Sequence, residues 1–271
     1  MSPELVLLLI ALGFLIGAYA GAIGTGGGFL VAPLLLFRYP EAAPAAITAA
    51  SLSVVLATSV GQTLVGIREG RTDYGVALGM ATVAVPAAVL GGYATTILPR
   101  TIFALMFAAL LVGVGTYIVL RPVATIAVPT TRWAWRRERT DRDGNRYLYR
   151  IPLLNSAGPS VAAAFFAALA GIGGGPLGVP VMTRIMHIPH ALAVPTMHVL
   201  ILVQTTAVLM YHFSTGNHGE PMRDVPWLAV GVLLGAPLSV WLRRRLGEGM
   251  LMRALAIGIF LIAARTVIGE L

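Results

Sequence analysis

The chain has 271 residues, of which 57% are hydrophobic and only 11% are charged. A soluble domain of this size needs far more charge to cover its surface, whereas long apolar segments with short charged connections are typical of a helical bundle in lipid. The apolar runs exceed the strands of about 10 residues that build a membrane β-barrel, and they do not alternate with polar residues. The composition therefore predicts an all-α integral membrane protein surrounded by the lipid bilayer.

Charge and cysteine content exclude several kinds of chemistry. All 19 basic residues are arginine and the net charge is +8; in a membrane protein arginine sets topology, so we expect no nucleic-acid partner. The absence of cysteine removes disulfides, iron–sulfur clusters, thiolate zinc sites and cysteine nucleophiles. The 11 acidic residues all lie at segment ends or in connections. We therefore expect neither a carboxylate-based cation site nor an enzyme, and no metal or other cofactor.

Eight apolar segments follow one another along the chain. Most have roughly 20 residues, the length that spans about 30 Å of hydrocarbon, but the first and the fifth are too long for one crossing. A glycine cluster interrupts each of these two, and glycine weakens a helix by about 1 kcal/mol per residue relative to alanine. We expect each to form two shorter helices with an unwound middle. The segments are residues 5–37, 44–67, 74–98, 101–120, 152–186, 191–213, 225–242 and 249–268.

The two halves of the chain match without gaps over a long stretch when one is shifted by 147 residues. Gly24 then falls on Gly171, and Pro33 falls on Pro180. We interpret this match as an internal duplication separated by a polar, arginine-rich linker. A plain topogenic loop is the first expectation for the linker, and a basic interfacial helix anchored by tryptophans is the alternative. The predicted divisions are residues 1–120, 121–151 and 152–271.

The arginines favour one of two topologies. If all eight segments cross the membrane, 12 arginines lie on one side and 7 on the other. If the first and fifth segments are re-entrant, 15 of the 19 arginines share one side. The positive-inside rule favours the second arrangement, with six full crossings, both termini periplasmic and the linker 121–151 cytoplasmic in a bacterial inner membrane. Each half then has three crossings. The halves are therefore expected to be inverted relative to one another, as in many secondary transporters.

The glycine clusters are the first candidate binding elements. Unwound backbone and helix N-termini offer N–H groups to an anion, and glycine has no side chain to block its approach. Close helix packing through small residues is the alternative role. Two clusters at matching positions, each followed by a proline, favour a small anionic substrate. The predicted backbone ligands are Gly24, Thr25, Gly26, Gly27, Gly28, Gly171, Gly173, Gly174 and Gly175.

Polar side chains inside the second and sixth segments are the second candidate elements. Ser51 and Thr58 are seven residues apart and share a helix face, and His198 and Thr205 occupy the duplicated positions. Such groups can donate to an oxyanion, although interhelical hydrogen bonding is the alternative. A histidine at membrane depth can bind an anion or carry a proton, or it can stay neutral against a backbone carbonyl. We predict these four residues and Gln204 as side-chain donors.

The paired glycine motif resembles the signature of the sulfite exporter TauE/SafE family. The resemblance is carried by residues 24–28 followed by Pro33 and by residues 171–175 followed by Pro180, and it extends to length, segment count, duplication and linker. It implies an inner-membrane permease for sulfite, sulfoacetate or a related organosulfonate, usually in the export direction.

Two short stretches depart from the pattern of that family. The family often has a Thr-Ser-Leu-like stretch at the start of the second and sixth segments, where this chain has residues 50–52, Ala-Ser-Leu, and residues 196–198, Thr-Met-His. The departure leaves the exact substrate open. An anion channel, a permease for a non-sulfur anion and a non-transporting membrane scaffold remain as alternatives, and the residues fix neither the energy source nor the oligomeric state.

Overall fold

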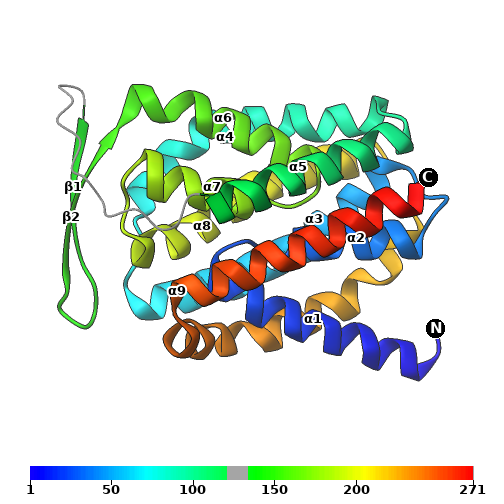
Figure 1. Cartoon of the computed structure of the whole chain (residues 1–271), viewed down its shortest axis with the longest axis horizontal. Coiled ribbons are helices and arrows are strands. Elements are labelled where there is room, and N and C mark those ends of the chain that lie inside the picture. Colours follow the sequence, from blue (N-terminus) through cyan, green and yellow to red (C-terminus); the bar gives the residue numbers. More distant parts are fainter. Residues whose placement is uncertain (121–133, 271) are drawn as a thin grey trace.

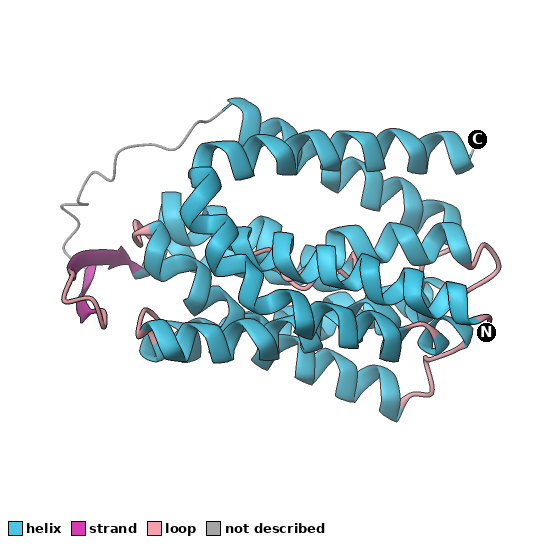
Figure 2. Ribbon diagram, turned by 90° about the horizontal axis from the view of Figure 1, so that it is seen from below, coloured by secondary structure: helices cyan, strands magenta, loops and turns pink. Residues whose placement is uncertain are grey.

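The computed structural model describes residues 1–120 and 134–270 as a bundle of helices along one long axis, with a β-hairpin at one end (Figure 1). Both chain termini lie at the opposite end, as Figure 2 also shows. We call the two ends the hairpin end and the terminal end. The elements are α1 (Pro3–Ile23), α2 (Gly28–Arg38), α3 (Pro44–Glu69), α4 (Tyr74–Ile97), α5 (Arg100–Leu120), β1 (Ala134–Thr140), β2 (Arg146–Pro152), α6 (Leu153–Leu169), α7 (Gly175–Pro180), the π-helical turn η1 (Val181–Ile185), α8 (His190–Ser214), the 3-10 turn η2 (Glu220–Arg223) and α9 (Val225–Glu270).

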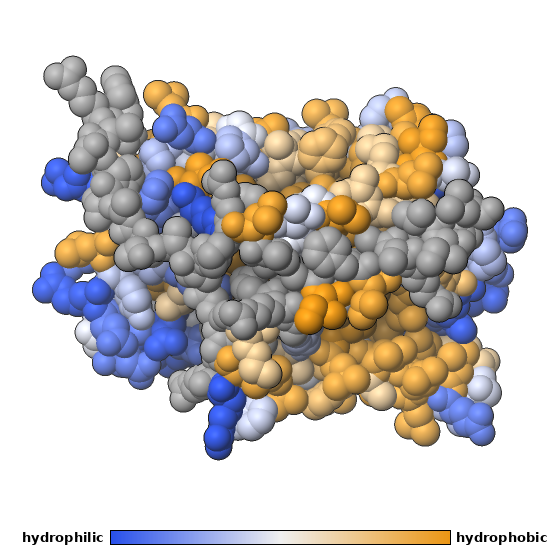
Figure 3. Space-filling view, in the orientation of Figure 1, coloured by the Kyte–Doolittle hydropathy of each residue, from blue (hydrophilic) through white to orange (hydrophobic). Residues whose placement is uncertain are grey.

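The described helices confirm a multi-pass membrane protein. Five stretches are long and apolar enough to cross a bilayer, namely α1, α3, α4, α8 and Val225–Leu242 of α9. Shorter apolar stretches occur in α2, α5 and α6. Figure 3 shows hydrophobic side chains across the middle of the bundle and hydrophilic ones gathered toward its ends. This distribution matches a protein whose middle lies in hydrocarbon and whose ends meet water.

The first and fifth apolar segments are broken, as predicted. The first consists of α1 and α2 with residues 24–27 between them, and the fifth consists of α6 and α7 with residues 170–174 between them. α1 starts at the terminal end, and Arg38 at the end of α2 pairs with Asp224 just before α9. α6 starts directly after β2, and α8 starts again at the hairpin end. Each broken segment therefore returns to the end from which it started.

The seventh and eighth apolar segments form one bent helix. We expected separate helices over 225–242 and 249–268, but α9 is helical from Val225 to Glu270. Figure 1 shows that α9 turns back in its middle, so that its second part runs toward the terminal end beside α5. Both predicted segments therefore lie within α9, and the polar stretch that joins them, which contains no proline, is helical as well.

The linker is not a plain loop over its described part. β1 and β2 form an antiparallel hairpin in which Arg137 lies opposite Tyr149, and residues 121–133 lie outside the described residues. The alternative of a basic helix is wrong for residues 134–151, where the predicted loop is a paired hairpin, and the fold is all-α only apart from this hairpin. β2 contains Tyr147, Tyr149 and Ile151, and aromatic and β-branched residues suit a strand. Gly144 in the turn has φ 84°, and the Asp141 carboxylate accepts the Asn145 N–H at 2.9 Å.

Small residues let the broken helix of each half pack closely on a helix of the other half. Gly13 and Gly17 of α1 face α9, where a Cβ on Gly13 would lie 2.5 Å from the Leu228 carbonyl oxygen. Gly91 of α4 faces α6, where its Cβ would lie 3.1 Å from the Leu169 nitrogen. Lipid tails give helices no hydrophobic reason to associate, so such backbone contact is a main source of attraction. The two halves of the chain interlock through these contacts.

Candidate functional site

The two helix breaks follow the same backbone path. In the first, Gly24, Gly26 and Gly27 have φ of 86°, 73° and 83°; in the second, the residues 147 positions later have φ of 67°, 78° and 108°. L side chains rarely adopt these angles, which explains why glycine stands at all six positions. The Gly24 N–H donates to the Ala20 carbonyl at 2.9 Å and closes α1 with a left-handed cap. The predicted unwound middles are present in both segments.

The breaks contact each other through their backbones. A Cβ on Gly28 would lie 2.6 Å from the Gly171 carbonyl oxygen, and a Cβ on Gly175 would lie 2.5 Å from the Gly24 carbonyl oxygen. Gly28 and Gly175 are matching residues of the two halves, and so are their partners, so the contact is reciprocal. The structure thus brings the two predicted clusters into contact. Within the first, the Thr25 hydroxyl donates to the Ala20 carbonyl at 3.4 Å.

Side chains from α3 and α8 hold the second break. The Ser51 hydroxyl of α3 donates to the Gly171 carbonyl at 2.7 Å. The Gln204 amide of α8 donates to the Gly173 carbonyl at 2.8 Å. Both side chains are buried. Because the C=O and the following N–H of a trans peptide point in opposite directions, the bond from Gln204 turns the Gly174 N–H away from α8.

The other predicted donors are buried but have different surroundings. Thr58 donates to the Val54 carbonyl of its own helix at 2.9 Å, and a Cβ on Gly27 would lie 3.9 Å from its oxygen. Thr205 is 1% exposed, and its hydroxyl has no hydrogen-bond partner among the described residues. His198 is also 1% exposed, on α8 between the positions of Thr196 and Gln204.

A small cavity adjoins the second break. Its volume is about 10 Å³, which is room for about one water molecule. Sequence reasoning missed most of its wall, because apolar and small residues carry no chemical signature. The lining includes Met80, Ser160, Gly174, Gly178, Met197 and Gln204.

A larger groove lies between α5 and α7. Its volume is about 390 Å³, and the described residues that line it are apolar or glycine, among them Leu110, Gly113, Pro176 and Leu177. It offers an oxyanion no side-chain donor, so it is not a second candidate for the anion site.

A polar contact near the first break was also missed as part of the site. The Gln62 amide of α3 donates to the Gly17 carbonyl of α1 at 3.3 Å, and the Ser239 hydroxyl of α9 donates to the Gln62 carbonyl oxygen at 3.0 Å. Gln62 is a buried amide in a predicted crossing, and that is the signal by which it could have been found. Gln62 does not occupy the position that matches Gln204, so an alignment of the two halves does not reveal that each break has a buried amide near it.

Charged groups are concentrated away from the breaks, at the hairpin end. Asp73 is buried where α4 begins; its carboxylate accepts hydrogen bonds from the Arg137 guanidinium and from the Tyr149 hydroxyl at 2.6 Å. Burial opposes ionisation, but these donors and the Val76 N–H outweigh it and hold the pKa of Asp73 below its ordinary value. In the hairpin turn, hydrogen bonds from Asn145 lower the pKa of Asp141 to about 2.

Comparison with known proteins agrees with this architecture. Residues 9–266 match the family model described as sulfite exporter TauE/SafE. A protein of Bacillus subtilis (strain 168), named "Probable membrane transporter protein YunE", is 25% identical over 250 residues, which cover 90% of this chain and 87% of that protein. No solved structure matches the chain.

Proposed function

Because the chain belongs to the sulfite exporter TauE/SafE family and is a membrane transporter rather than an enzyme, we propose that it exports a small sulfur-containing anion. Sulfite, sulfoacetate and related organosulfonates are the substrate class. The proposal rests on one observation above all: two glycine breaks with the same backbone angles meet in the middle of an apolar bundle.

The proposed site is formed by backbone amides of residues 26–28 and 173–175, since the N–H groups of Gly24, Thr25 and Gly171 donate to carbonyls of α1 and α6. α2 begins at Gly28 inside the bundle, and the first N–H groups of a helix have no partner within it. The partial positive charge of such an N-terminus stabilises an anion, most strongly where water is excluded. No residue of either break is charged, so the amides can bind an oxyanion without the cost of a buried cation.

We assign Ser51 and Gln204 to positioning the second break. A serine hydroxyl has a single hydrogen, and that of Ser51 is donated to the Gly171 carbonyl. Anchoring the Gly173 carbonyl leaves the following N–H, that of Gly174, to face a substrate, whereas the N–H that follows the Gly171 carbonyl donates to the Ala167 carbonyl at 2.9 Å. Thr205, whose hydroxyl has no partner among the described residues, is the stronger candidate for a direct donor; His198, two turns earlier in α8, and Thr58 near the first break are the other candidates.

The same geometry supports an inverted repeat over residues 1–120 and 152–271. The contact of Gly28 with Gly171 is repeated by that of Gly175 with Gly24. The broken segments enter from opposite ends. α3 and α8, which match in the sequence, run antiparallel, and a Cβ on Gly66 near the end of α3 would lie 3.0 Å from the Pro195 Cβ near the start of α8. Binding sites of inverted-repeat transporters lie at the repeat interface near the midplane.

Arginine distribution supports the orientation of the chain in the membrane. The linker hairpin, Arg68, Arg71 and Arg184 belong to the hairpin end, and Arg38 and Arg223 belong to the terminal end. Positive charge concentrates on the cytoplasmic side. The hairpin is therefore proposed to face the cytoplasm, with both termini in the periplasm of a bacterial inner membrane.

The small cavity favours a carrier over an open channel. A volume of about 10 Å³ leaves no room for an oxyanion and its hydration, so the substrate enters only when the bundle rearranges. Movement between states is the property that separates a carrier from a channel.

Transport by purified protein in liposomes tests the proposal. Liposomes loaded with sulfite or sulfoacetate are expected to release it at a saturable rate, and an excess of unlabelled substrate on the far side should drive counterflow of the labelled anion. Acetate should not be carried. Flux that never saturates and shows no counterflow indicates a channel. No flux of any anion, from protein with an intact melting transition, contradicts a transport role for these sulfur anions.

A further inference from the structure

Asp73 forms a buried junction at the hairpin end. Its carboxylate caps α4 by accepting the Val76 N–H at 3.1 Å, and it accepts hydrogen bonds from Arg137 of β1 and Tyr149 of β2. Arg139 adds a nitrogen 3.6 Å from the same carboxylate. The carboxylate is fully buried, so these donors replace all the water that it would otherwise bind.

The backbone of Asp73 extends the junction to the second half of the chain. Its N–H donates to the Thr196 hydroxyl of α8 at 2.9 Å, and both residues are buried. One residue thus connects the first half through α4, the linker through β1 and β2, and the second half through α8. A tie between parts that are far apart in the sequence restrains their relative movement more than a contact within one helix does.

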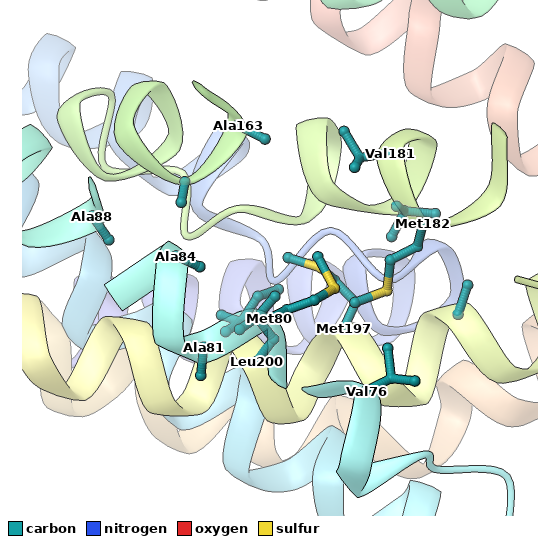
Figure 4. Close-up of a cluster of buried hydrophobic side chains, with 14 of the residues drawn as sticks. Val76, Met80, Ala81, Ala84, Ala88, Ala163, Val181, Met182, Met197 and Leu200 are labelled. Atoms are coloured by element: carbon teal, nitrogen blue, oxygen red, sulfur yellow. The ribbon is translucent and has the colours of Figure 1, made fainter. Parts of the chain in front are cut away.

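An apolar plug lies between this junction and the second break. Figure 4 shows Met80 of α4, Met182 of η1 and Met197 of α8 turned toward one another. Met197 reaches the break, since a Cβ on Gly174 would lie 3.1 Å from its terminal methyl group. Met80 and Met197 also line the small cavity. Methionine is flexible and fills irregular gaps, so such a plug can repack when the helices around it shift.

We propose that Asp73 and Thr196 are the positioning residues of a gate at the hairpin end, and that Met80, Met182 and Met197 are its plug. The Asp73–Thr196 bond holds the start of α4 against α8, immediately before Met197 in the chain. Opening requires α4 and α8 to separate, which exposes the small cavity and the second break to the hairpin side. This inference rests on the proposed function, because a gate has a role only if the break region takes up a solute.

Cysteine labelling tests the gate without any substrate. The chain contains no cysteine, so Ser160→Cys provides one thiol in the cavity wall, where Ser160 is 5% exposed. The rate of its reaction with a charged maleimide is measured in lipid nanodiscs, in the parent and with Asp73→Asn or Thr196→Val added. Thr196→Val keeps the ion pairs of Asp73 and removes only the connection to α8. Ser214→Cys, on the exposed end of α8, controls for the intrinsic reactivity of the reagent.

Both gate variants are expected to raise the labelling rate of Ser160→Cys by about threefold to tenfold, the factor by which the loss of one typical hydrogen bond shifts an equilibrium. Thr196→Val removes the neutral bond from the Asp73 N–H. Asp73→Asn keeps that bond but weakens the charge-assisted bonds from Arg137 that hold the start of α4. Ser214→Cys should label at an unchanged rate. Asp143→Asn, which neutralises an exposed hairpin carboxylate paired with Arg71, should leave both rates unchanged.

Unchanged labelling in a folded Thr196→Val variant overturns the gate, and so does an equal increase with Asp143→Asn. If Asp73→Asn fails to fold, the Thr196→Val result decides alone. Absence of anion transport with enhanced labelling refutes the proposed function and leaves the gate standing, so the two failures can be told apart.

Discussion

The two helix breaks share a backbone but differ in the side chains around them. Both place glycines with positive φ at matching positions and press against each other's backbone. Ser51 and Gln204 hold the second break by donating hydrogen bonds to the carbonyls of Gly171 and Gly173. Near the first break the corresponding amide is Gln62, which reaches back to Gly17 inside α1. Duplicated backbone geometry therefore does not require duplicated side-chain contacts.

This difference shows which roles can be transferred from one half to the other. The position that matches Gln204 holds Ala57, and the position that matches Ser51 holds His198. An alignment of the halves therefore locates the glycines of both breaks but not the side chains that orient them. We expect substitutions of the matching glycines to have equal effects and substitutions of matching polar residues to have unequal ones.

The largest expected effect follows from adding a methyl group where the breaks touch. In Gly175→Ala and Gly28→Ala the new Cβ meets the backbone of the other break, which cannot move aside, so each should lose about 3 kcal/mol or more of unfolding free energy. Melting curves in detergent measure the loss. Gly113→Ala is the control, because its Cβ meets nothing within 4 Å, and it should be neutral or stabilising by up to about 1 kcal/mol. Wild-type melting of Gly175→Ala would refute the reciprocal contact.

Removing the amide that holds the second break should have the next largest effect. Gln204→Leu leaves the buried Gly173 carbonyl without its donor, at a cost of about 1–3 kcal/mol. Thr206→Val, in the same helix but exposed, should stay within about 0.5 kcal/mol of wild type. Denaturation midpoints give both values. Equal midpoints for the two variants would mean that Gln204 does not hold the break.

Acid should destabilise the hairpin end and spare the breaks, which carry no ionisable group. Burial opposes ionisation of Asp73, but hydrogen bonds from Arg137, Tyr149 and the Val76 N–H outweigh it and make the pKa lower in the folded protein than in the unfolded chain. A lowered pKa stabilises the fold above the unfolded value of about 3.9, and this stabilisation disappears as the pH falls through the folded value. The Asp73 contribution to the melting temperature should therefore be constant above about pH 5 and be lost below about pH 4. In Asp73→Asn this part of the acid loss should be absent; an unchanged acid profile would contradict the assignment.

The smallest expected effect distinguishes two matching threonines. Thr58→Val loses a bond to its own helix and should cost about 0.6 kcal/mol. Thr205→Val removes a buried hydroxyl that has no partner among the described residues, so stability should stay level or rise while anion affinity falls. Melting temperature and calorimetry are measured on both variants. Loss of stability in Thr205→Val would show that its hydroxyl is structural.

The sequence predicted features that follow from composition and from glycine placement. The membrane bundle, the two broken segments and the position of both breaks are confirmed. These depend on local properties, namely long apolar runs and residues that tolerate positive φ, and both can be read from a single chain. The assignment of the glycines as anion ligands stays a prediction.

Features that depend on tertiary contacts were not predicted. Residues 134–152 form a hairpin whose Arg137 and Tyr149 bind Asp73, a partner more than sixty positions earlier. The continuous helix of α9 was missed because its polar middle resembles a connection when only hydrophobicity is considered. The carbonyls that accept from Ser51 and Gln204 belong to the second break. Where that backbone lies relative to α3 and α8 cannot be predicted from the types of residue in the sequence.

Binding calorimetry on purified protein tests the central claim, an oxyanion site at the two breaks, most directly. Sulfite, sulfoacetate, sulfate and acetate are titrated into wild type, into Ser51→Ala/Gln204→Ala, and into Ser53→Ala, whose hydroxyl bonds only to its own helix and a methionine sulfur. We expect wild type and Ser53→Ala to bind the sulfur oxyanions and not acetate, and the double variant to bind at least about tenfold more weakly. Wild-type affinity in a folded double variant, or no binding of any anion by folded wild type, would contradict the account.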